Sequence, residues 1–168
     1  MHALYVFSVW LHILAATVWI GGMLFLVLVI VPWLRRGGSS DAAVFLRETG
    51  ERFRNVGWAC FVILAITGTS NLWARGVRLS DFTRAEWLQS PFGKMVIVKL
   101  SAFLLVLLVS AAHDFVVGPR ATRAIAEDPN SPRARTERRR AALLGRFNVL
   151  LALLLVAAGV MLVRGTPW

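Results

Sequence analysis

The chain has 168 residues, of which 57% are hydrophobic, and a formal net charge of +10 at pH 7. Its mean hydropathy of +0.64 is too high for an ordinary soluble domain, so a soluble enzyme is excluded. A basic chain can also bind nucleic acid, but arginine-rich loops beside anionic lipid headgroups explain this charge more simply. We therefore expect the lipid bilayer as a partner and no nucleic acid.

Four apolar segments are long enough to cross a bilayer, which takes about 20 residues in a helix. They lie near residues 4–34, 56–74, 92–117 and 141–163. The first has neither a preceding basic region nor a small-residue cleavage site, so we interpret it as a retained helix and not as a signal peptide. The sequence predicts an all-α fold, a four-helix antiparallel transmembrane bundle, with a single integral membrane domain over residues 1–168.

The arginines predict the orientation of this bundle. The first connection carries five arginines and the third carries seven, whereas the second carries only three arginines and one lysine. The positive-inside rule therefore places the first and third connections in the cytoplasm and both termini outside. The basic residues counted are Arg35, Arg36, Arg47, Arg52 and Arg54, then Arg75, Arg78, Arg84 and Lys94, then Arg120, Arg123, Arg133, Arg135, Arg138, Arg139 and Arg140.

The outer connection contains helix-start signals. Thr83 followed by Glu86 is a capping-box pattern and predicts a short helix over residues 83–89, lying on the outer membrane surface. Ser90 and Pro91 then suit the N-cap and the first turn of the third span.

The inner connection contains helix-stop signals. Gly118 and Pro119 predict the end of the third helix, and residues 128–132, with two prolines, predict a flexible loop.

Two ionisable residues lie at similar depths inside the spans. His12 lies about 12 Å from the outer end of the first span and Lys99 about 10 Å from that of the third. Ionisable residues at such depths are candidate functional sites, so we expect one outer-half site holding both. Two simpler roles stay open. His12 can be a packing residue hydrogen-bonded to Thr67 or Asn71, and Lys99 can lift its ammonium group to the outer interface.

A second polar pair lies near the inner end of the third span. His113 and Asp114 are about 21 Å from Lys99 along the helix axis, so they cannot share a small site with it. We expect an interface pair near Arg120. The lone cysteine, Cys60, excludes an intrachain disulfide and is expected to be a buried packing residue.

Several short motifs of this sequence, in their order along the chain, resemble the copper resistance protein D family of membrane proteins. The resemblance covers roughly residues 11–120. It is carried by the stretch LHILAATVWIGGM at 11–23, by Arg52-Phe53-Arg54, by Thr67-Gly68 with Asn71 and Leu72, by Pro91-Phe92-Gly93-Lys94, by Lys99-Leu100, and by Gly118-Pro119-Arg120.

This resemblance implies copper transport or copper homeostasis in a bacterial inner membrane, with a periplasmic copper protein as a partner. Copper(I) prefers thioether and imidazole ligands, so His12, Met23 and Met95 are candidate relay positions, and His2 with Met1 is a candidate outer capture point. Longer family members carry additional transmembrane helices before the matching region. Further copies of the chain, in a homo-oligomer, are another expected partner.

A second resemblance implies different chemistry. The histidine on the first helix and the lysine on the third are similar to those of HemJ-type protoporphyrinogen oxidases, which implies haem b as cofactor with His12 and Lys99 as ligand or essential residues. The alternative function is then a membrane oxidoreductase or electron-transfer protein. Under the copper interpretation the chain is not an enzyme, and no catalytic residue is assigned. A structural subunit of a larger membrane complex is the third interpretation.

Overall fold

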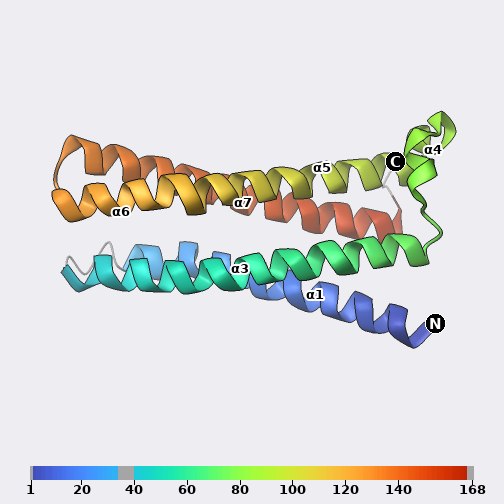
Figure 1. The fold of residues 1–168 in the computed structure, drawn as a ribbon, viewed down its shortest axis with the longest axis horizontal. Coiled ribbons are helices and arrows are strands. Elements are labelled where there is room, and N and C mark those ends of the chain that lie inside the picture. Colours follow the sequence, from blue (N-terminus) through green and yellow to red (C-terminus); the bar gives the residue numbers. More distant parts are fainter. Residues whose placement is uncertain (1, 34–39, 166–168) are drawn as a thin grey trace.

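The chain forms a bundle of long antiparallel helices (Figure 1). The computed structural model describes residues 2–33 and 40–165 and, within these ranges, contains no strand. The all-α prediction is therefore confirmed. In chain order the elements are α1 (His2–Phe25), the π-helical turn η1 (Leu26–Ile30), α3 (Ser40–Ala74), the 3-10 turn η2 (Leu79–Thr83), α4 (Ala85–Gln89), α5 (Pro91–Ala112), the π-helical turn η3 (His113–Val117), α6 (Gly118–Glu127) and α7 (Pro132–Arg164).

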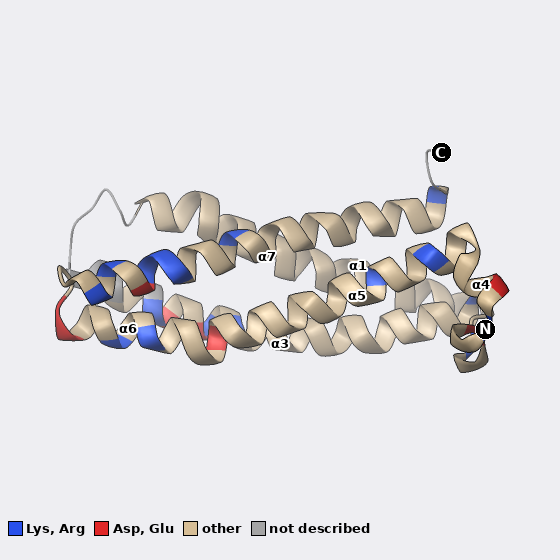
Figure 2. Ribbon diagram, turned by 90° about the horizontal axis from the view of Figure 1, so that it is seen from above, with Lys and Arg blue, Asp and Glu red and all other residues tan. Residues whose placement is uncertain are grey.

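Two helical hairpins make up the bundle. Helix α1 packs along α3, and α5 packs along α7, while α1 also contacts α7 and α3 contacts α6. The two chain ends and α4 lie at one end of the bundle, which we call the termini end (Figure 1). Arginines gather at the opposite end, on α6 and on the first turns of α3 and α7, which we call the arginine-rich end (Figure 2).

All four long helices contribute to one hydrophobic core. Its buried members are Ala15, Trp19 and Met23 from α1, Cys60, Phe61 and Leu64 from α3, Val106 from α5, and Leu151 and Ala152 from α7. The ring of Phe61 lies 4.9 Å from that of Trp19 and 6.2 Å from that of Phe103, between centroids. Phe61 therefore joins the two hairpins. Cys60 is buried, as predicted.

The outer surface of the bundle is apolar as well. Many large hydrophobic side chains are more than 40% exposed, among them Leu4, Val62, Leu104 and Leu150. Four helices have the length and hydropathy to cross a membrane, at His2–Trp33, Arg47–Ala74, Pro91–Glu127 and Pro132–Arg164. A helix that is apolar on all sides is stable in lipid but not in water, so the chain is a multi-pass membrane protein.

The prediction that Gly118 and Pro119 end the third helix is wrong. The backbone continues through η3 into α6, and α5 to α6 form 37 helical residues, about 55 Å long and longer than a bilayer requires. Pro119 lies in the first turn of α6, where its missing N–H is tolerated because the wider π-turn before it already interrupts the regular hydrogen bonds. Only residues 128–131 separate α6 from α7.

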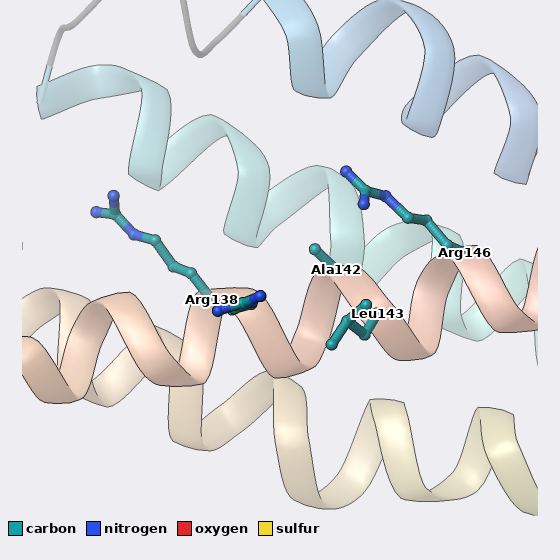
Figure 3. Close-up of a pocket in the computed structure, with 5 residues that line it drawn as sticks. Arg138, Ala142, Leu143 and Arg146 are labelled. Atoms are coloured by element: carbon teal, nitrogen blue, oxygen red, sulfur yellow. The ribbon is translucent and has the colours of Figure 1, made fainter.

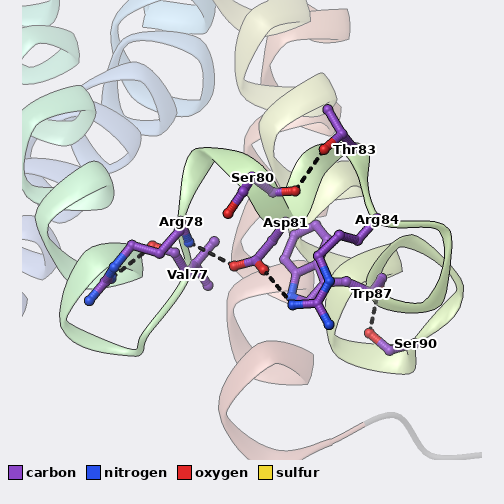
Figure 4. A network of polar contacts seen from close by, with 8 residues as sticks. All are labelled: Val77, Arg78, Ser80, Asp81, Thr83, Arg84, Trp87 and Ser90. Carbon is purple, nitrogen blue, oxygen red and sulfur yellow. Dashed lines mark hydrogen bonds and ion pairs between the residues drawn. The ribbon is translucent and has the colours of Figure 1, made fainter.

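The capping box predicted at Thr83 is also wrong. Arg84 precedes α4 and makes no side-chain cap, while the Thr83 hydroxyl donates to the Ser80 carbonyl at 2.8 Å. Just before η2, the Arg78 backbone N–H donates instead to an Asp81 carboxylate oxygen at 2.8 Å (Figure 4). The Asp81 backbone N–H donates to the Arg78 carbonyl at 3.0 Å. The short helix exists, but it begins at Ala85 rather than at residue 83.

The predicted start of the third long helix is confirmed. The Ser90 hydroxyl oxygen accepts from the Gly93 backbone N–H at 3.0 Å, and Pro91 lies in the first turn. The same hydroxyl donates to the Trp87 carbonyl at 2.6 Å (Figure 4). Ser90 thus joins the end of α4 to the start of α5 and fixes the angle between them.

Candidate functional site

His12 on α1 forms a hydrogen bond across to Thr67 on α3. The distance from His12 Nδ1 to Thr67 Oγ1 is 2.7 Å. The Thr67 hydroxyl already donates its single proton to the Ile63 carbonyl, at 2.6 Å. Thr67 Oγ1 must therefore accept from His12, which makes Nδ1 the protonated nitrogen. In a neutral imidazole this leaves the Nε2 lone pair free to bind a proton or a metal ion.

Small and polar residues surround this pair. A Cβ atom on Gly68 would lie 3.4 Å from His12 Cε1, an ordinary contact distance, so the α3 backbone at Gly68 lies beside the imidazole ring. One helical turn toward the termini end, Ser8 Oγ and Asn71 Oδ1 are buried and have no hydrogen-bond partner among the described residues. Both are four residues from a member of the His12–Thr67 pair and continue the same polar stripe.

Lys99 of α5 is half-buried and lies against α7. A Cβ atom on Gly159 would be 3.6 Å from Lys99 Nζ. The Lys99 charge is close enough to act on His12, and the Arg75 charge is close enough to act on Lys99. A guanidinium nitrogen of Arg75 donates to the Leu162 carbonyl at 3.2 Å. Among the described residues Lys99 forms no ion pair, so basic charge gathers here without a matching carboxylate.

The structure therefore brings His12 and Lys99 into one region and confirms the predicted Thr67 contact. The other proposed copper ligands lie elsewhere. Met23 is 7% exposed within the hydrophobic core, about 16 Å along α1 from His12. His2 is exposed at the start of α1, and Met1 lies outside the described residues. No group of three or more His, Cys, Asp or Glu side chains gathers in the described part of the chain.

Met161 is a candidate that the sequence interpretation missed. It lines a pocket of about 190 Å³ at the termini end together with Met95, between the start of α5 and the end of α7. The pocket also includes Phe92 and Leu162. Two thioethers from different helices are a soft donor pair. The signal was present in the antiparallel pairing of the third and fourth spans, which brings the beginning of one beside the end of the other.

His113 and Asp114 form part of a link between α3 and the turn η3. His113 Nδ1 lies 3.1 Å from one Asp114 oxygen, and the Trp58 indole N–H donates to the other, also at 3.1 Å. Both residues belong to the π-helical turn η3. The side chains are 37% and 21% exposed, and the fourteen residues from Lys99 to His113 correspond to about 21 Å along the helix axis.

Another buried polar contact joins α5 to α7. Asn148 Nδ2 donates to Ser110 Oγ at 3.0 Å, and the two residues are 9% and 5% exposed. Asn148 Oδ1 has no partner among the described residues. The sequence shows Asn148 as a polar residue inside the fourth span, but a lone asparagine gives no signal for its serine partner.

Comparisons with known proteins agree with the fold and the motifs. The sequence profile described as copper resistance protein D matches residues 47–162. A curated protein of Aquifex aeolicus (strain VF5), described as an uncharacterized protein, is 32% identical over 153 residues, which cover 89% of each chain. No solved structure matches the chain.

The bounds of the profile match differ from those of the motifs in the sequence. The match includes α7 and omits α1, so His12 lies outside it while Lys99, Met95 and Met161 lie inside. Three of the four membrane-length helices are nevertheless covered in order. The chain belongs to the copper resistance protein D family.

Proposed function

We propose that the protein transports copper or maintains copper homeostasis in a bacterial inner membrane, with His12 as a copper ligand. The observation that carries this proposal is the hydrogen bond from His12 Nδ1 to Thr67, which leaves Nε2 available. Metal-binding histidines typically donate their other ring N–H to an oxygen, which fixes the tautomer and the orientation of the ring. Family membership supports copper as the metal.

The soft donors suggest a direction of movement along the bundle. Met95 and Met161 share the pocket at the termini end, His12 lies further in, and Met23 lies about 16 Å beyond it. We place copper(I) first at the thioether pair, then at His12, then near Met23. A periplasmic copper protein would deliver the ion at the termini end, where the exposed His2 is a further contact, and a second copy of the chain would complete the path.

The basic surroundings of His12 suit transit better than storage. A protonated Lys99 repels a copper ion at His12, which weakens binding. A conducting site must bind its ion strongly enough for the ion to enter and weakly enough for it to leave. Lys99 and Arg75 would therefore shorten the residence of copper at His12.

A haem-b oxidoreductase or electron-transfer protein is the second candidate. Lys99 and Arg75 are basic, and no carboxylate of the described residues pairs with Lys99. The carboxylate groups of a porphyrin would complement this positive charge. His12 Nε2 would hold the haem iron, and the small residue Gly68 lies beside the imidazole ring. Haem, when bound, would supply one-electron redox chemistry, while Thr67 would orient its ligand.

Purified protein distinguishes these two functions. We expect copper(I) to bind after anaerobic loading, with no Soret band in the absorption spectrum. His12→Ala should abolish copper retention in a folded protein, and Met161→Leu should reduce copper uptake into vesicles, whereas Met161 is expected not to matter for haem. A reducible Soret band lost in His12→Ala would establish the haem function instead and would contradict the copper proposal.

Lys99 provides a further comparison. Under the copper proposal, Lys99→Met removes the repulsion and should tighten copper binding while slowing its release, and Lys99→Arg should resemble the parent because its charge is kept. Under the haem alternative with Lys99 as a ligand, Lys99→Arg fails, because a guanidinium group does not deprotonate in proteins. Equal behaviour of the parent, Lys99→Met and Lys99→Arg would show that Lys99 serves neither role.

A further inference from the structure

Arg146 of α7 lies among side chains that face outward into the apolar surface of the bundle. It is exposed, and its neighbours Leu143, Phe147 and Leu150 are 54%, 45% and 63% exposed. These neighbours would face lipid in a membrane. An uncompensated guanidinium group in such surroundings is unfavourable and normally finds an anionic partner or reaches the interface.

No carboxylate of the described residues is that partner. The ion pairs at this end of the bundle join Arg133 to Glu127 and Arg140 to Glu137, at 3.1 and 2.9 Å. Among the described residues, Arg138, Arg139 and Arg146 form no ion pair. Their three exposed charges are therefore available to an anionic ligand.

The same three arginines line one depression on α7. It has a volume of about 340 Å³, and its remaining lining residues are Ala142 and Leu143 (Figure 3). In Figure 3 the Arg138 and Arg146 side chains extend from the same side of α7, with Ala142 between them. The depression thus has an apolar floor and a guanidinium group at each end. The backbone positions of Arg138 and Arg146 are about 12 Å apart along the helix axis.

We propose that this depression binds an anionic phospholipid of the phosphatidylglycerol type. Its phosphate accepts hydrogen bonds from Arg146 and from Arg138 or Arg139, and one acyl chain lies along Leu143. Guanidinium groups bind phosphate through paired hydrogen bonds, and basic pockets at the ends of transmembrane helices suit anionic headgroups. An inorganic anion would satisfy the arginines but would leave the apolar floor unused. This assignment does not depend on copper or haem binding.

Reconstituted full-length protein tests the site. Spin-labelled lipids in phosphatidylcholine vesicles give the relative association constants of phosphatidylglycerol and phosphatidylcholine. We expect the parent to prefer phosphatidylglycerol, and expect the variant Arg138→Gln, Arg139→Gln, Arg146→Gln to lose on the order of fivefold in this preference per arginine. The control Arg52→Gln, Arg120→Gln, Arg123→Gln removes the same charge from other exposed positions at this end and should keep most of the preference.

Equal losses in the two triple variants would overturn the proposal, because diffuse surface charge would then explain the preference. Inorganic phosphate at matched concentration should not displace phosphatidylglycerol, and displacement would show that the site binds a free anion. The variant Arg146→Leu tests whether a loss of lipid preference comes from a folding defect. In phosphatidylcholine alone it should unfold at a higher temperature than the parent, and added phosphatidylglycerol should no longer stabilise it. A lower unfolding temperature with an unchanged response to phosphatidylglycerol would also contradict the site.

Discussion

At the scale of single residues, the position of one proton decides what His12 can do. Thr67 uses its own proton on the Ile63 carbonyl, so it can only accept from His12. The hydrogen bond therefore joins α1 to α3 and also fixes the tautomer of the imidazole. A variant that removes the hydroxyl but keeps the size of the side chain tests both roles, one by its stability and the other by its metal content.

Thr67→Val is expected to lower the free energy of unfolding by about 1 kcal/mol, because His12 Nδ1 loses its acceptor. It should also lower copper retention, because the ring can then turn and change its tautomer. Thr67→Ser keeps the oxygen and serves as the control. Thermal unfolding in detergent and the metal content after loading check both effects. If the valine variant retains copper as the parent does, the threonine does not orient the ligand.

Ser110→Ala is expected to destabilise the bundle by about 1 kcal/mol, because Asn148 then loses its acceptor while its own oxygen is already unpartnered. Adding Asn148→Leu should recover most of the loss, since an apolar pair leaves no buried polar group. Unfolding of the two single variants and the double variant forms a thermodynamic cycle. A double variant less stable than Ser110→Ala would mean that Asn148 contributes through another contact.

The sequence predicted part of this site. Depth along the helices brought His12 and Lys99 to one level, and it offered Thr67 and Asn71 as two possible partners of His12. The structure selects Thr67. Depth does not give the direction in which a side chain points, however. The pairing of Met95 with Met161 and of Ser110 with Asn148 depends on how α5 and α7 are rotated about their axes, and apolar helices with weakly differing faces do not specify that rotation.

At the scale of the elements, short turns set where the long helices begin. Ser90 and Gly93 pack the end of α4 against the start of α5, and a Cβ atom on Gly93 would clash with the Trp87 backbone carbonyl oxygen. Backbone cannot move aside as a flexible side chain can. The position of α4 therefore depends on a glycine at residue 93.

Gly93→Ala is expected to cost about 1–3 kcal/mol of stability, as overpacking typically does. Gly145→Ala is the matched control, because a Cβ there meets nothing within 4 Å, and alanine should stabilise a helical position with free space by up to about 1 kcal/mol. Unfolding temperatures in the same detergent compare the two variants. Equal changes in unfolding temperature for the two variants would show that α4 can move away from residue 93 without loss of stability.

The two wrong predictions at this scale have a common physical reason. Thr83 and Pro119 were interpreted from local patterns, and in both places a neighbouring turn changes the outcome. The 3-10 turn η2 uses the Thr83 hydroxyl internally, and the π-helical turn η3 accommodates Pro119. Non-α turns of five residues have no strong sequence signal, so cap and stop patterns beside them are misassigned.

At the scale of the whole molecule, the four spans, their order and the single core follow from hydropathy and connection length. The distribution of charge adds a direction. Basic residues gather at the end opposite the two chain termini (Figure 2), and helices α3, α6 and α7 carry them beyond the apolar region. Such an asymmetry sets the orientation of a helical membrane protein during insertion.

Both termini are therefore expected outside the cell membrane, with the arginine-rich end in the cytoplasm. Single cysteines at exposed Ser80 and Asn130, in a Cys60→Ala background, report the two ends. In intact cells an impermeant maleimide should label Ser80→Cys and leave Asn130→Cys unlabelled until the membrane is opened. Labelling of Asn130→Cys alone would reverse the orientation. A reversed orientation would also place the thioether pocket of Met95 and Met161 on the cytoplasmic side, so copper would enter the proposed path from the cytoplasm and leave the cell.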